Sequence, residues 1–225
     1  GFQPDLVWVK ARSTWPTTND HKLTDAVRGV TKAIVSNDDT AETTDSTGLT
    51  AFGSDGFTVG VDADYSSQVG TGMVAWNWKA NGAGSANTAG DIDSTVSVNA
   101  TAGFSIVKYE GSGSAGDTVG HGLSAAPEML FAKNLDYADV WVVGHENMHA
   151  STPWEYEMYL NGTNAAADSA NPWNDVAPSS TLITLGGGNV TNKSGDDIII
   201  YAFHSVEGYS KVGSYEGNGN LDGTF

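Results

Sequence analysis

Pro4-Asp5-Leu6-Val7-Trp8-Val9-Lys10 recurs later in the chain as Pro127-Glu128-Met129-Leu130-Phe131-Ala132-Lys133. Each copy starts with proline and an acidic residue, continues as an apolar run, and has lysine at its seventh position. The copies lie 123 positions apart in a chain of 225 residues. A motif repeated in this way indicates a tandem duplication of one supersecondary unit, and such units bury their apolar faces partly against each other.

Two further pairs of segments keep nearly the same spacing. Residues 34–37 match residues 158–161 at 124 positions, and residues 74–78 match residues 199–203 at 125 positions, with large apolar side chains in the outer places of the latter pair. Chance matches would not keep one spacing, so we interpret the chain as two homologous units.

Another pair has a shorter spacing. Gly103-Phe104-Ser105 and Tyr109-Glu110-Gly111-Ser112-Gly113 recur as Gly208-Tyr209-Ser210 and Tyr215-Glu216-Gly217-Asn218-Gly219. The spacing is 105 at the first glycine and 106 at the second aromatic position, so the later copy holds one extra residue, as a β-bulge would.

The position of this strand in the repeat predicts an assembly contact. We expect residues 104–113 and 127–133 to be neighbouring strands, whereas no matching strand precedes residues 4–10. The C-terminal strand is then expected to complete the first unit, either within the chain or in a neighbouring copy. The residues of this expected contact are Tyr209, Val212, Tyr215, Leu6 and Trp8.

The fold class follows from short apolar runs separated by turn residues. β-Branched and aromatic runs are bounded by Gly, Asn, Asp or Ser, and the chain has 28 glycines and little helical periodicity. We predict an all-β protein of two homologous antiparallel β-sandwich units in tandem, of the jelly-roll or lectin-like type. The expected limits are unit 1 at 1–81, a linker or long loop at 82–102, unit 2 at 103–207, and a C-terminal strand at 208–225.

Charge and composition exclude some partners. Ten basic and 27 acidic residues give a formal net charge of −17, so a phosphate backbone would be repelled and nucleic acid is not an expected partner. No run of about 18 apolar residues is present, so no membrane insertion is expected. The chain has no cysteine and therefore no disulfide or thiol chemistry.

His145-Glu146-Asn147-Met148-His149 matches the zinc-peptidase pattern, in which two histidines one helical turn apart hold zinc and the glutamate activates water. Glu155 stands where an extended form of the motif has its third ligand. A strand-like run precedes the segment and Pro153 follows it, which disfavours the required helix. A zinc hydrolase is therefore the least favoured alternative, behind a surface turn.

Two other sets of residues are binding candidates. Paired carboxylates in turns offer the hard oxygen ligands that calcium uses, although aspartate is also common in turns that bind nothing. These weak calcium candidates are Asp62, Asp64, Asp196 and Asp197. Tryptophans in proline-containing loops are candidates for stacking on glycan or for an interface, and loop anchoring is the simpler alternative. They are Trp15, Trp154 and Trp173.

The first ten residues, the Ser54-Asp55-Gly56-Phe57-Thr58-Val59-Gly60 turn, the Val74-Ala75-Trp76-Asn77-Trp78-Lys79 strand and residues 208–219 together resemble a repeat domain of large virion proteins of tailed phages, especially marine ones. The resemblance covers essentially the whole chain. It implies a non-enzymatic virion protein, such as a tail fibre or a tail or head appendage, with a lectin-like sandwich fold. The expected partners are copies of itself, other virion proteins and a host surface glycan. A carbohydrate-binding adhesion module is the main alternative.

Overall fold

The computed structural model describes residues 1–12, 19–66 and 72–219. Its strands are β1 (Leu6–Ala11), β2 (Lys22–Asp25), β3 (Lys32–Val35), β4 (Thr43–Thr44), β5 (Leu49–Gly53), β6 (Gly56–Val59), β7 (Met73–Trp78), β8 (Ser85–Asn87), β9 (Ser94–Asn99), β10 (Phe104–Glu110), β11 (Thr118–Gly120), β12 (Met129–Asn134), β13 (Val142–His145), β14 (Tyr156–Tyr159), β15 (Ala167–Asp168), β16 (Leu182–Thr184) and β17 (Asp197–Phe203). The helices are the single turns α1 (Ala63–Ser66), η1 (Pro153–Glu155) and α2 (Asn189–Asn192). None of the helices among these residues is long and apolar enough to span a bilayer.

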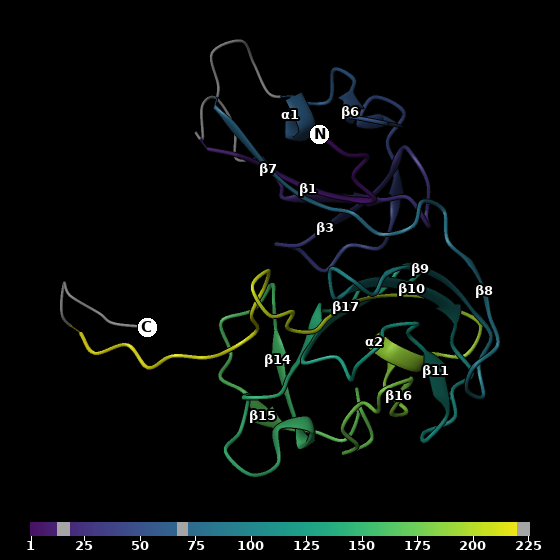
Figure 1. Cartoon of the computed structure of the whole chain (residues 1–225), viewed down its shortest axis with the longest axis vertical. Helices are drawn as coiled ribbons and strands as arrows, with labels where there is room; N and C mark the ends of the chain where they lie inside the picture. Colours follow the sequence, from purple (N-terminus) through teal and green to yellow (C-terminus); the bar gives the residue numbers. More distant parts are fainter. Residues whose placement is uncertain (13–18, 67–71, 220–225) are drawn as a thin grey trace.

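The strands form two large sheets. A five-stranded sheet has the order β4-β3-β2-β1-β7, and an eight-stranded sheet has the order β15-β14-β13-β12-β17-β10-β9-β8 (Figure 1). Two small pairs, β5-β6 and β11-β16, complete the set. Every ladder between the named strands of the described residues is antiparallel. The predicted all-β class is therefore confirmed.

The two large sheets pack face to face, because side chains alternate across each strand and one apolar row of each sheet points toward the other. This central core joins Leu6 and Trp78 of the first sheet to Phe104, Ile106 and Tyr201 of the second. In Figure 1 the first sheet, purple to blue, lies above the second, teal to yellow.

Each sheet also has an outer cover. On the first sheet, Val7 and Val9 pack beneath the β5-β6 hairpin and the buried Tyr65 of α1. On the second sheet, the cover comes from the β11-β16 pair and from the loops that carry Trp154 and Trp173. The result is four layers, with the central strands β1, β12 and β17 covered on both faces, which explains why these strands are nearly continuous apolar runs.

A buried polar network crosses the central core. The Arg28 Nε donates to Asp25 Oδ2 at 2.5 Å, and the hydroxyl of Tyr201 on β17 donates to the same oxygen at 2.7 Å. The arginine side chain is 1% exposed and the aspartate side chain is fully buried. Nearby, Trp141 Nε1 donates to the carbonyl of Val35 at 2.7 Å, again from the second sheet to the first. These bonds fix how the sheets sit on each other.

Two expectations about strand arrangement are wrong. Residues 82–102 are not a linker or long loop, because β8 and β9 extend the eight-stranded sheet and Val96 is buried. Residues 81–90 are small and polar and show no apolar strand pattern. The β8-β9 pair is held by backbone hydrogen bonds, which composition does not reveal. The strand at 104–110 is not a neighbour of β12, because β17 lies between them.

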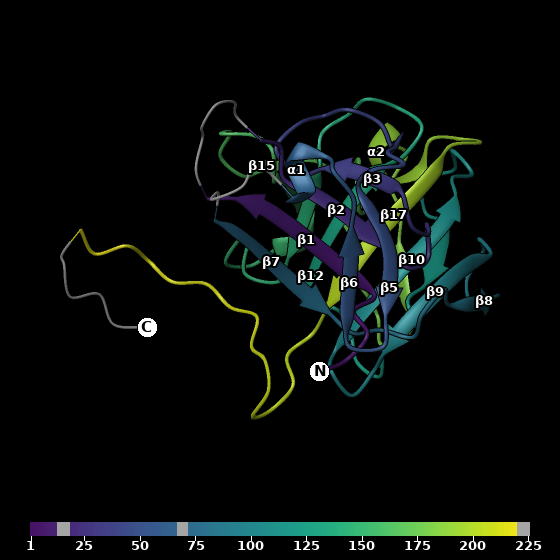
Figure 2. The ribbon, with the colours of Figure 1, turned by 90° about the horizontal axis from the view of Figure 1, so that it is seen from above.

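The C-terminal segment does not complete the first unit within the same chain. Residues 211–219 form no strand, and residues 213–219 leave the body of the molecule (Figure 2). The expected acceptor strand is occupied, since β1 pairs with β2 on one side and β7 on the other, and Leu6 and Trp8 are core side chains. The edge of that sheet is β7.

We expect the Arg28 network to control stability. The Arg28→Met variant leaves Asp25 buried without its cation and should lower the free energy of unfolding by about 3–5 kcal/mol. Tyr201→Phe removes one charge-assisted hydrogen bond and should cost about 1.5–3 kcal/mol. Urea denaturation measures both, with exposed Lys79→Met as the control. A loss in Arg28→Met no larger than in the control would contradict this role.

Candidate functional site

The zinc-peptidase pattern adopts a strand and a turn. His145 is the last residue of β13, and the following residues form a turn. Its Nδ1 accepts the backbone N–H of Asn147 at 3.0 Å, while Nδ1 of His149 accepts that of Thr152 at 3.2 Å. The His149 ring stacks on Tyr156 at 4.4 Å. The helix required by a zinc-peptidase site is absent from this segment, so the two histidines serve local turns.

Among the described residues, no group of three or more His, Asp or Glu side chains is placed to hold a metal ion. Asp62 accepts the backbone N–H of Asp64 at 2.9 Å and so caps the turn of α1. Burial, and next repulsion from Asp45, raises the pKa of Asp62. Asp64 accepts the backbone N–H of Asp20 and lies 3.5 Å from Lys22.

The other two calcium candidates also have protein partners. Burial opposes ionisation of Asp196, but hydrogen bonds from Asn134 at 2.9 Å and from Lys193 at 3.0 Å lower its pKa. Asp197 pairs with Lys108 at 2.6 Å. All four carboxylates therefore perform structural work in turns and strand ends, and the structure does not bring the two pairs together at one site.

Two of the three candidate loop tryptophans are buried. Trp154 is 6% exposed and Trp173 is 1% exposed, and their rings meet edge to face at 6.3 Å in the outer core of the second sheet. Their prediction as glycan contacts is wrong, because their loops fold over the sheet as its cover. Trp15 lies outside the described residues.

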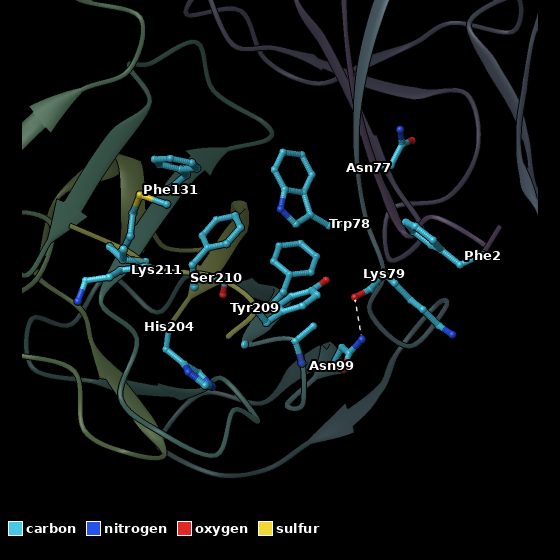
Figure 3. A pocket seen from close by; sticks show the side chains of 16 residues that line it. Phe2, Asn77, Trp78, Lys79, Asn99, Phe131, His204, Tyr209, Ser210 and Lys211 are labelled. Carbon is cyan, nitrogen blue, oxygen red and sulfur yellow. Dashed lines mark hydrogen bonds between the residues drawn. The ribbon is translucent and has the colours of Figure 1, made fainter. Parts of the chain in front are cut away.

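A cavity of about 530 Å³ opens at the edge of the central core (Figure 3). Its floor is aromatic: Phe203 contacts Trp78, Phe104 and Phe131 with ring centroids 6.1, 5.0 and 5.7 Å apart. The floor comes from β7, β10, β12 and β17, so both sheets build it. Residues 209–212 form part of its wall.

The polar residues around this cavity are Asn77, Lys79, Asn99, His204, Ser210 and Lys211. Asn99 Nδ2 donates to the carbonyl of Lys79 at 3.3 Å, the dashed line in Figure 3. His204 is 7% exposed; its Nδ1 lies 2.7 Å from the carbonyl of Ser205, and its Nε2 is buried without a hydrogen-bond partner in the described residues. An aromatic floor with polar groups at its rim suits a ligand that has an apolar face or ring and a polar edge.

Sequence reasoning did not find this cavity. The matched aromatic positions Trp78 and Phe203 were its signal, since each ends the last strand of its sheet. A repeat shows which positions are apolar, but it does not show which of them border open space.

Of the residues expected in assembly, those at the C-terminus are exposed. Tyr209 and Tyr215 are 73% and 72% exposed, and Val212 is partly buried against the cavity. Leu6 is 2% exposed. The structure thus brings Tyr209 and Val212 near the end of β7 rather than beside Leu6 and Trp8.

The sequence matches one family over residues 1–225, described as a domain of unknown function (DUF7483). The chain belongs to this family. No curated protein matches the sequence, and no solved structure does. The DUF7483 match spans both sheets and the C-terminal segment as a single domain.

Gly144 tests the structural role of the two tryptophans. A Cβ at this position would lie 2.6 Å from Cζ3 of Trp154 and 2.9 Å from Nε1 of Trp173. Gly144→Ala should therefore lower the free energy of unfolding by about 1–3 kcal/mol through overpacking. In Gly187→Ala the new Cβ meets only Ala115 at 3.6 Å, so stability should stay unchanged or rise slightly. Equal thermal melts for the two variants would refute the tight packing.

Metal addition tests the histidine turn. Neither one equivalent of zinc nor a chelator should shift the melting temperature of the wild-type chain, because His145 and His149 already accept local hydrogen bonds. His149→Ala should cost about 1 kcal/mol, mainly from the bond to Thr152. Zinc-dependent stabilisation that disappears in both His145→Ala and His149→Ala would restore the metal-site interpretation.

Proposed function

We propose that the chain is a non-enzymatic structural protein of a phage particle, part of a tail fibre or of a tail or head appendage. On this proposal it is located in the virion and assembles with copies of itself and with other virion proteins. The supporting observation is that its two sheets share one strand order and one pairing register, as expected of a duplicated building unit.

The match of register is clearest at the central pair of strands. In the first sheet Leu6 of β1 faces Trp78 of β7, and in the second Met129 of β12 faces Phe203 of β17. These positions are separated by 123 and 125 residues, which are the spacings of the sequence repeat.

The outer strands agree as well. Lys22 faces Val35 in the first sheet where Val142 faces Tyr159 in the second. Lys32 faces Thr44 where Tyr156 faces Asp168. Lys32 and Tyr156 are 124 positions apart, and so are Thr44 and Asp168. A one-residue slip would turn every side chain to the other face, so agreement over these pairs supports common descent of the two units.

Each unit also places a one-turn helix shortly before its last strand. α1 precedes β7 and α2 precedes β17, and their first residues are 126 positions apart. Stacked repeats of this kind build extended, rigid proteins, because every unit buries one face on its neighbour. Together with the phage-like motifs, this architecture supports a structural role, and a net charge of −17 favours solubility.

The aromatic cavity supports a second candidate function, a carbohydrate-binding adhesion module. Sugar rings stack on aromatic faces, and Tyr209 stands exposed at its wall. This candidate is compatible with a position at the tip of a fibre, where the glycan would belong to the host surface.

Mass spectrometry of purified particles tests the structural proposal. Particles made by the genome that encodes the chain should contain it in constant ratio to the major capsid protein, and immunogold labelling should place it on one part of the particle. Its presence in the lysate and absence from particles would overturn the proposal.

A glycan array tests the second candidate. Saturable binding of one glycan class that is lost in Tyr209→Ala and kept in Val61→Ala, which changes another exposed residue, would favour adhesion. No binding, or equal binding by both variants, would remove that candidate.

A further inference from the structure

The two large sheets have four edges, and one of them is unlike the others. β4 and β15 have two residues each and β8 has three, whereas β7 has six. Short edge strands discourage pairing with another chain, and so do prolines, charges and bulges. β7 reads Met-Val-Ala-Trp-Asn-Trp, has none of these features, and leaves Trp76 45% exposed. Its outer edge is unpaired within the described ranges.

The matching strand of the second sheet is not an edge. β17 pairs with β12 on one side and with β10 on the other, and Phe104 faces Phe203 with ring centroids 5.0 Å apart. The first sheet therefore lacks the equivalent of β10 at the outer side of β7.

The chain carries a second copy of the β10 sequence. Residues 208–219 repeat residues 103–113, but residues 211–219 form no strand, and beyond the cavity wall residues 213–219 run away from both sheets (Figure 2). The first residues of the repeat lie in a tight turn in which the N–H of Ser210 donates to the carbonyl of Val206 at 3.0 Å, so this turn has to open when the strand is donated. Tyr209 at its start borders the same cavity as Trp78.

We propose that residues 209–216 of a second copy of this chain add to β7 as a sixth, antiparallel strand. The register of β10 on β17, moved by the repeat spacings, places Tyr209 opposite Trp78, Ser210 opposite Asn77 and Val212 opposite Ala75. This inference rests on the duplication proposed above and not on the location in a virion.

The side-chain pattern of the donor fits this register. In β10, Phe104 and Ile106 point into the central core, while Val107 and Tyr109 point into the outer core. In the donor, Tyr209 takes the place of Phe104 against the aromatic floor, and Val212 takes the place of Val107. Lys211 takes the place of Ile106, opposite Trp76, which is 45% exposed, so the ammonium group can stay in water. The extra residue before Tyr215 forms a bulge at the far end of the strand.

A second copy is the occupant because, within the described residues, the outer edge of β7 is open and the chain's own donor belongs to neither sheet. Acceptor and donor are different surfaces, so the contact is head-to-tail and builds either a ring or a filament. Both copies are strongly acidic, so association should strengthen as salt screens their repulsion.

Disulfide trapping tests the register and the source of the strand. The chain has no cysteine, so Asn77→Cys and Ser210→Cys are prepared as separate variants at exposed positions, mixed and oxidised. Opposed residues of antiparallel strands are close enough for a disulfide, and a dimer of one chain of each kind is expected. Asn77→Cys mixed with Lys211→Cys is the control, because Lys211 points to the other face of the strand and should give no such dimer.

The variant with both Asn77→Cys and Ser210→Cys in one chain separates the two sources. Donation by a second copy gives disulfide-linked oligomers from this double variant. A monomer with an internal disulfide, or equal trapping at Lys211, would overturn the proposal. The particle assay above is unaffected by either result, because it detects the chain whatever its contacts.

A peptide assay covers the case of variants that do not fold. A chain that lacks residues 209–225 should be monomeric in analytical ultracentrifugation, with the melting temperature of the wild type at low concentration. It should bind a synthetic peptide of residues 207–219 with one-to-one stoichiometry in calorimetry. Val212→Pro in the peptide should weaken binding about tenfold, because proline removes a donor from the ladder. No binding of the wild-type peptide would overturn the proposal.

Discussion

The packing of the two sheets against each other depends on one buried cation. Arg28 lies in the turn between β2 and β3, removed from water, at a point where the second sheet presents Tyr201. Burial alone would lower the pKa of this guanidinium, but Asp25, Tyr201 and Glu42 more than reverse that effect. An uncompensated charge in this position would cost several kcal/mol, so the turn, the tyrosine and the carboxylates must meet in one geometry. The aromatic core supplies most of the burial between the sheets, and this network selects the relative position in which that burial occurs.

That relative position also creates the cavity. The sheets meet closely at Trp141, whose indole bonds to the first sheet, and they separate at the end where Trp78 and Phe203 finish their strands. The same end carries the open edge of β7 and the start of the C-terminal segment. This face therefore combines an aromatic cavity, a long open strand edge and the start of the projecting C-terminal segment, whereas the other three edges of the large sheets are strands of two or three residues.

Sequence reasoning succeeded where the structure depends on local pattern. The runs around Leu6 and Leu130 are strands because their β-branched and aromatic residues suit a sheet buried on both faces. It failed where long-range contacts decide. Val96 belongs to a strand that exists only because β10 is beside it, and Trp173 is buried only because its loop crosses the sheet. The open edge of β7 was less predictable still. Its sequence matches that of β17, which is a central strand, and only the sheet order shows that β7 is at an edge.

The turns at Asp25 and His145 occupy equivalent places, because Leu6 faces the first and Met129 faces the second. In both, the side chain accepts the N–H of the residue two positions later at 3.0 Å. One turn is sealed between the sheets and the other is on the periphery. After the duplication we propose, the two turns were under different constraints. The inner turn had to keep a carboxylate to pair with Arg28, whereas the outer turn had no buried cation to pair with. A chimera made by exchanging the halves would place a histidine in the centre and a carboxylate outside. The order of the two copies is therefore part of what the sequence encodes.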